Sequence, residues 1–173
     1  MATSVRIRPF EESDAAELTA AALESVTEMM PWMPWCHPGY LESDSVAWIH
    51  ATIEGHEAGT MHEFAILDEV GRYAGGCGIS QINRQTGVAN LGYWVRTSAT
   101  GRGIAPVAVR QLAAWAFQNT PLHRLEIVVA VANLRSQRVA EKAGAHRDAV
   151  LRKRVLVHGQ PSDAVLYSIL RPD

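Results

Sequence analysis

The middle of the chain holds a strand, a long helix and a second strand, and this order constrains the fold more than any other feature. Residues 88–95 have the pattern of a strand. Apolar side chains then recur on one face over residues 102–119, as in a helix packed on a sheet. Residues 124–131 are nearly all aliphatic, which favours a central strand covered on both faces. Because a strand–helix–strand crossover joins parallel strands, we expect residues 88–95 and 124–131 to lie parallel.

Shorter elements flank this unit on both sides. The other expected strands have alternating or aliphatic patterns, and they are residues 5–8, 64–67, 73–82, 149–157 and 164–170. The other expected helices begin at capping residues, and they are residues 14–29, 44–57 and 133–143. Together these elements predict an α/β (α+β) fold with a mixed, mostly antiparallel sheet of about seven strands and about four helices.

The composition is typical of one globular domain, which we expect to span residues 1–173. The formal net charge of -2 argues against a broad basic surface for nucleic acid. Cys36 and Cys77 cannot form a disulfide framework, and no metal-binding spacing is evident. With no hydrophobic leader and no apolar run of the ~20 residues that a membrane span needs, we expect a cytoplasmic protein without membrane contact.

A glycine loop joins the strand at 88–95 to the long helix. The first amides of a helix have no partners within it, and the helix dipole places partial positive charge there. Gly101 and Gly103 allow close backbone approach, and Arg102 adds a full positive charge. The loop therefore predicts a site for a phosphate or pyrophosphate.

A glycine loop alone could equally be an ordinary strand–helix turn. A Walker A loop needs a Lys-Ser or Lys-Thr pair, which is missing here. A dinucleotide-binding fingerprint needs a third glycine, and Pro106 stands at that position. A nucleotide-binding module of either type is therefore not favoured.

The loop and its surroundings resemble the GCN5-related N-acetyltransferase (GNAT) superfamily, and in particular its RimJ/RimL branch. The acyl-CoA-binding motif Gln/Arg-x-x-Gly-x-Gly/Ala aligns with residues 100–105, where Gly103 and Ala105 match and Thr100 replaces Gln or Arg. Other segments match in the family order, and they are residues 5–10, 32–35, 91–94, 122–126, 133–136, 141–144 and 164–170.

The resemblance implies a GNAT fold in which acetyl-CoA lies where the parallel fourth and fifth strands splay apart. The residues implied in donor binding come from three segments, and they are Tyr93, Trp94, Val95, Gly101, Arg102, Gly103, Ile104, Ala105 and Asn133. The first three would pair with the pantetheine arm and the next five would hold the pyrophosphate. Asn133 would contact the pantetheine and could also cap the helix that it precedes.

The resemblance also implies that the hydroxyl of Ser136 protonates the leaving thiolate of CoA. A first-turn serine with no catalytic role is the alternative. Many relatives use a tyrosine as the acid, but Ala140 stands at that position here.

The general base is not assigned by the resemblance. Asn90 replaces the glutamate that many relatives carry on the fourth strand. Glu28, His37 and Glu63 are therefore the open candidates for this role.

The implied activity is acetyl-CoA-dependent N-acetylation by direct attack of an amine on the thioester. The resemblance to the RimJ/RimL branch implies a protein N-terminal α-amine as the acceptor. A pKa near 7.8 leaves roughly a quarter of such an amine neutral near pH 7.4, which suits an enzyme with no assigned base. The alternatives are a small amine (antibiotic, polyamine or amino acid derivative) and a non-catalytic acyl-CoA-binding protein. Trp32 and Trp35 are expected to line the acceptor side or to pack in the core. We expect a homodimer and no metal cofactor.

Overall fold

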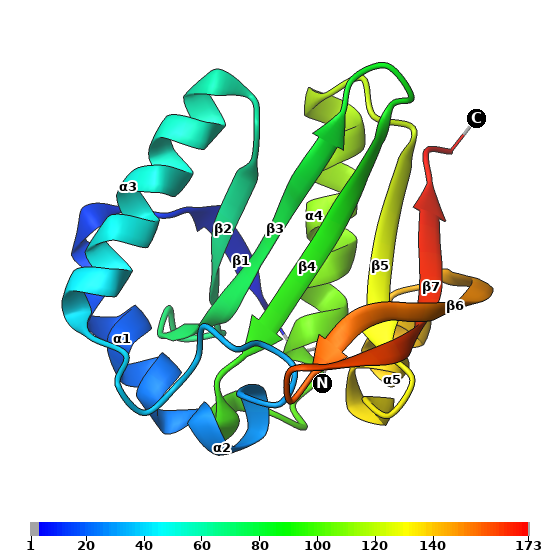
Figure 1. The fold of residues 1–173 in the computed structure, drawn as a ribbon. Helices are drawn as coiled ribbons and strands as arrows, with labels where there is room; N and C mark the ends of the chain where they lie inside the picture. Colours follow the sequence, from blue (N-terminus) through cyan, green and yellow to red (C-terminus); the bar gives the residue numbers. More distant parts are fainter. Residues whose placement is uncertain (1–3, 173) are drawn as a thin grey trace.

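A computed structural model describes residues 4–172 and shows a seven-stranded sheet with helices on both faces (Figure 1). The strand order is β1-β2-β3-β4-β5-β7-β6. In chain order the strands are β1 Arg6–Pro9, β2 His62–Leu67, β3 Tyr73–Asn83, β4 Val88–Val95, β5 Arg124–Ala130, β6 His146–Val157 and β7 Gln160–Leu170. The helices are α1 Ala15–Glu24, α2 Val26–Met29, α3 Glu42–Ala58, α4 Ile104–Asn119 and α5 Leu134–Lys142.

The parallel pairing of β4 with β5 is confirmed, and it is short. The paired residues are Val88 with Arg124, Ala89 with Leu125 and Asn90 with Glu126. All other neighbouring strands are antiparallel in the described sheet. Beyond Asn90 and Glu126 the two strands separate, so the predicted splay of the fourth and fifth strands is confirmed.

The helices form two layers. Figure 1 views the sheet from the face that α1, α2 and α3 cover, with α4 behind it. Behind the sheet, Ile104 and Leu112 of α4 belong to the main apolar core. In front, Leu18 of α1 and Ile49 of α3 pack together over β2 and β3 in a second core. The β6–β7 hairpin curls in front of β5 toward the end of β4 (Figure 1).

The first helix differs from the prediction, because it is broken at Ser25. The Ser25 hydroxyl donates to the carbonyl of Ala21 at 2.7 Å and accepts from the backbone N–H of Thr97 at 3.0 Å. A buried serine that bonds both to its own helix and to a distant loop interrupts the helix there. The predicted single helix over 14–29 is therefore two helices, α1 and α2.

The expectation that the strand at 124–131 is covered on both faces is wrong. Leu125, Ile127 and Val129 are buried against the helical layer behind the sheet. The alternate residues of β5 are only half-buried, and they include the charged pair Arg124 and Glu126. Aliphatic residues fill one face of β5, while the other face borders the more open front of the sheet.

No helix within residues 4–172 is long and apolar enough to cross a membrane.

Candidate active site

The separation of β4 from β5 creates a gap whose two walls come from different parts of the chain. The first wall is residues 91–95 of β4, which keep β3 as a neighbour through pairs such as Gly92 with Gly78. The second wall is residues 127–130 of β5, which keep β7 as a neighbour. On the side of the gap, the β4 backbone groups have no strand opposite them in the described sheet. An extended ligand could therefore pair with β4 as a strand would.

The N-terminus of α4 lies directly after β4. Gly101 and Gly103 both have φ of 76°, in the left-handed region that favours glycine. No described side chain caps this helix, so its first amides are available to an anion. A Cβ at Gly101 would meet nothing within 4 Å, which leaves room for a ligand at the loop. These features fit a pyrophosphate.

Arg102 is engaged by carboxylates. Its guanidinium lies 2.5 Å from Glu69 Oε1 and 3.5 Å from Asp68 Oδ2, both in the turn between β2 and β3. Its positive charge is therefore shared, and the backbone of the loop is the stronger anion-binding element.

The start of α5 borders the gap on the β5 side. The side-chain oxygen of Asn133 accepts from the backbone N–H of Ser136 at 3.1 Å, so Asn133 caps the helix as its position suggested. This contact leaves the amide NH₂ of Asn133 as its remaining donor group.

A hydrogen bond joins the two walls of the gap. Tyr93 Oη lies 2.8 Å from the carbonyl oxygen of Ser136, to which it donates, and 3.0 Å from Ser136 Oγ. Burial raises the pKa of Tyr93 to about 12, so its hydroxyl stays protonated near neutral pH. Sequence reasoning missed this contact, since it placed Tyr93 in the site only through its backbone. The alternation of β4 was the available signal, because Tyr93 faces the helices behind the sheet.

A small cleft opens at the wide end of the gap. Its lining residues come from the α2–α3 loop, β5, the start of α5 and the end of β6, and they are Trp32, Met33, Val128, Val129, Ala130, Asn133, Ser136, Val155, Leu156 and Val157. The cleft thus brings Trp32, Asn133 and Ser136 together. The contribution of β6 could not be inferred from the sequence, because it depends on how the β6–β7 hairpin curls.

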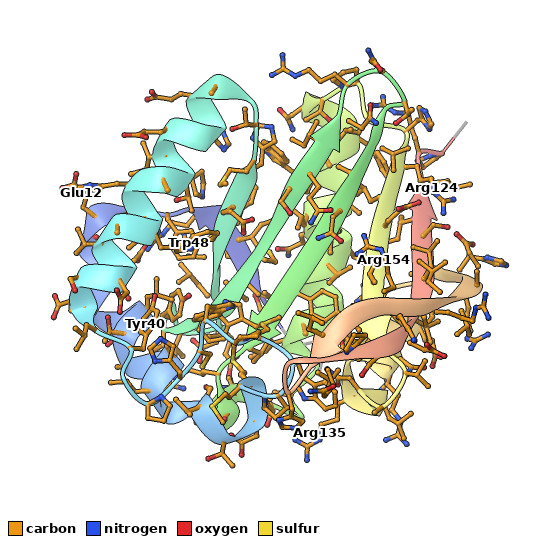
Figure 2. All side chains as sticks on the ribbon, viewed as in Figure 1. Glu12, Tyr40, Trp48, Arg124, Arg135 and Arg154 are labelled. Atoms are coloured by element: carbon orange, nitrogen blue, oxygen red, sulfur yellow. The ribbon has the colours of Figure 1, made fainter. Side chains whose placement is uncertain are left out.

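The two loop tryptophans lie in different places. Trp32 lines the cleft. The ring of Trp35 instead packs edge-on against Trp94 at 5.6 Å and against Tyr40 at 5.7 Å between centroids. Trp35 and Trp94 therefore anchor the loop that presents Trp32. Tyr40, which Trp35 also contacts, lies at the base of the α3 layer in Figure 2.

The three candidate bases differ in their surroundings. Glu28 is exposed and accepts from Thr97 Oγ1 at 2.9 Å. His37 is exposed, and its Nδ1 accepts from the backbone N–H of Gly39 at 3.1 Å. Glu63 is half-buried, and desolvation raises its pKa to about 7. Within residues 4–172, no three His, Cys, Asp or Glu side chains are grouped so that they could hold a metal ion.

Comparison with known proteins identifies the class of enzyme to which this gap belongs. The sequence model of one protein family, the acetyltransferase (GNAT) domain, matches residues 4–146 of this chain. The chain therefore belongs to the GNAT family and is an acyltransferase.

Individual relatives narrow this class. YdaF of Bacillus subtilis, described as a candidate ribosomal N-acetyltransferase, is 28% identical over 174 aligned residues, which cover 96% of this chain and 91% of YdaF. The structure of RimJ from Mycobacterium smegmatis, in complex with a CoA disulfide, is 26% identical with a TM-score of 0.85, covering 96% and 81% of the two chains. RimL, a ribosomal L7/L12 α-N-protein acetyltransferase solved with coenzyme A, has the same fold, with 20% identity, a TM-score of 0.89 and coverage of 98% and 95%. The chain is thus a RimJ/RimL-like member of the family.

Proposed function

We propose that this enzyme transfers the acetyl group of acetyl-CoA to the N-terminal α-amine of a protein. The observation that carries the proposal is the gap itself, where an unpaired stretch of β4 leads to the uncapped N-terminus of α4. The likeness to YdaF and RimJ supports a ribosomal protein as the acceptor. Such an acceptor fits the cytoplasmic location expected from the sequence.

The donor would lie along both elements. The backbone of Tyr93, Trp94 and Val95 would pair with the pantetheine arm, and the NH₂ group of Asn133 would reach it from the opposite wall. The amides of residues 102–105 would hold the pyrophosphate. This placement would direct the thioester along β4 from α4 toward Leu91 and Gly92, so that it lies next to the contact between Tyr93 and Ser136.

The reaction itself is direct attack of a neutral amine on the thioester carbonyl. The new C–N bond forms, the C–S bond breaks and the thiolate of CoA leaves. Ser136, which lines the cleft, would supply a proton to the thiolate and would regain one from the nitrogen that attacks the thioester, as this nitrogen becomes the amide. Trp32 would form part of the acceptor wall.

The acceptor is tested by measuring turnover on amines of two kinds. Acetyl-CoA is offered with peptides that carry the N-terminal sequences of ribosomal proteins, and separately with a panel of polyamines, aminoglycosides and amino acid derivatives. We expect N-terminal acetylation of a subset of peptides, located by fragment mass spectrometry. Fast acetylation of a small amine, with no peptide acetylated, would replace the protein acceptor with the small-molecule alternative. Binding of acetyl-CoA without any turnover would support a non-catalytic acyl-CoA-binding protein instead.

Two further proposals concern the organisation of the molecule. We retain residues 1–173 as a single acetyltransferase domain and a homodimer as the assembly. Limited proteolysis and light scattering of the purified chain test these two expectations.

A further inference from the structure

Glu63 lies in a row of residues that crosses the front of the sheet toward the gap. Glu63 of β2 pairs with Gly78 of β3, and Gly78 pairs with Gly92 of β4. Since facing residues in paired strands point to the same side, the three positions share one face. That face is the front, because Ala65, two residues along β2, packs in the front core.

The two glycines leave the space that the carboxylate needs. A Cβ at Gly78 would overlap the carboxylate of Glu63, so the side chain of Glu63 lies across the bare backbone of β3 toward β4. A Cβ at Gly92 would meet nothing within 4 Å. The path from the carboxylate to the gap therefore crosses open space above Gly92.

The distance along this path suits one intervening water molecule. Neighbouring strands lie about 4.8 Å apart, so a carboxylate over β3 is roughly one strand spacing from β4 and the edge of the gap. An amine that attacks a thioester in the gap from the front would lie within reach of Glu63 through a single water.

The charge environment of Glu63 leaves this carboxyl without a fixed counter-ion. In the described part of the chain, Glu63 has no hydrogen bond or ion pair, and desolvation is the one cause that shifts its pKa.

The titratable groups on the elements around β2 are few. The nearest on β3 is the thiol of Cys77, whose pKa is raised by burial and by Glu63. On β1, Arg8 pairs with Asp14. The buried positions of α3 (Ser45, Ile49, Thr52 and Gly55) carry no charge. His56 of α3 lies 3.2 Å from His62 between their Nδ1 atoms, next to Glu63 in sequence.

We propose that Glu63 is the general base of this acetyltransferase. Its carboxylate accepts a proton from the acceptor ammonium through one water, which leaves a neutral amine and a neutral carboxylic acid. The acid returns the proton to solvent before the next turnover. This assignment rests on the proposed function, because it assumes transfer of an acetyl group to an amine, but it holds for any amine acceptor. It places the base on β2, whereas many relatives carry a glutamate on β4 at the position of Asn90.

The test compares wild-type enzyme with Glu63→Gln and, as a matched control, Glu54→Gln, an exposed glutamate of α3. The measured quantity is kcat/KM between pH 6 and pH 9.5 with whichever peptide or small amine the wild type acetylates. If Glu63 must be ionised and the amine protonated, the wild-type profile is bell-shaped between a pKa near 7 and that of the amine. Glu63→Gln should lose about 100-fold at pH 7. Its profile should rise with the pKa of the amine and reach a plateau, so that the deficit shrinks at pH 9.5.

Binding measurements separate this role from a structural one. The Kd for CoA, measured by calorimetry, should be the same in all three proteins, and Glu54→Gln should keep the wild-type profile. A Glu63→Gln enzyme with wild-type kcat/KM, or with a uniform loss at every pH, would overturn the assignment. Acetylation of small amines alone would defeat the protein acceptor yet still test Glu63 on those amines. Absence of turnover with every amine would overturn both proposals.

Discussion

The hydroxyl groups of Ser136 and Tyr93 are hydrogen-bonded to each other, and either one can be the donor. Tyr93 has a single O–H, which can point at the carbonyl oxygen or at Oγ of Ser136. If Ser136 is the general acid, as proposed, a Tyr93 hydroxyl that points at Oγ leaves the Ser136 proton free to move to the thiolate of CoA. Tyr93 would then be a positioning residue that donates to Ser136 as the serine gives up its own proton. This second hydroxyl would come from β4, because Ala140 of α5 has none.

This pairing predicts a specific pattern of loss on substitution. Ser136→Ala should lower kcat by about 100-fold, as expected for removal of a general acid, with the Kd for CoA unchanged. Tyr93→Phe should lower kcat by about 10-fold, because the serine keeps its proton but loses its orientation. The double variant should be no slower than Ser136→Ala alone, since the tyrosine acts through the serine. Steady-state kinetics and calorimetry measure both quantities, and additive losses would contradict the coupling.

At this scale the sequence predicts some roles and not others. Asn133 is a recognisable cap, because a capping residue directly precedes an expected helix. Glu63 has no such signal, since its burial follows from the register of β2 on β3 and from a glycine that is distant in sequence. The sequence predicts that Arg102 carries a charge near the loop, but it does not reveal the carboxylates of the β2–β3 turn that share this charge.

At the scale of elements, the N-terminus of α4 is expected to bind the donor through its backbone. Gly103→Glu should abolish CoA binding by calorimetry, because a side chain and a negative charge would enter the phosphate site. The residue also has a φ of 76°, so strain alone must be excluded. Gly59→Glu is the matched control, since Gly59 has a φ of 64° at the C-terminal end of α3, where only the flexible Arg84 side chain is close. Equal losses of affinity in the two variants would remove α4 from the donor site.

The central strand–helix–strand unit could be predicted because each element has its own periodicity and a crossover fixes their relative direction. Ser25 shows where such reasoning fails. Its hydroxyl bonds to Ala21 and to the distant Thr97, so a tertiary contact breaks a helix that local sequence favours. The prediction that both faces of β5 are covered fails for a related reason. The aliphatic composition of a strand does not show which of its faces the neighbouring elements leave uncovered.

At the scale of the whole molecule, the buried carboxyl group of Glu63, which is proposed to support activity, also affects the stability of the fold. A carboxyl whose pKa rises from 4.5 to about 7 on folding keeps its proton in the folded state at a pH where the unfolded chain has lost it. The contribution of Glu63 to stability is therefore highest at low pH and declines as pH rises from 4.5 through about 7. Above that range, the folded protein carries a charge that burial disfavours. A functional carboxylate of this kind lowers the stability of the active form.

The size of this effect can be measured. One pKa unit corresponds to 1.36 kcal/mol, so a rise from 4.5 to about 7 amounts to about 3 kcal/mol. Relative to wild type, Glu63→Gln should gain up to about 3 kcal/mol in the free energy of unfolding between pH 4.5 and pH 8, because glutamine has no charge to desolvate. Urea unfolding followed by circular dichroism at both pH values gives the difference, with Glu54→Gln as the exposed control. A gap between wild type and Glu63→Gln that stays constant with pH would mean that Glu63 ionises as freely in the folded protein as in the unfolded chain. The same carboxyl could not then have the near-neutral pKa that suits a general base, so this stability measurement tests the catalytic assignment without requiring any acceptor.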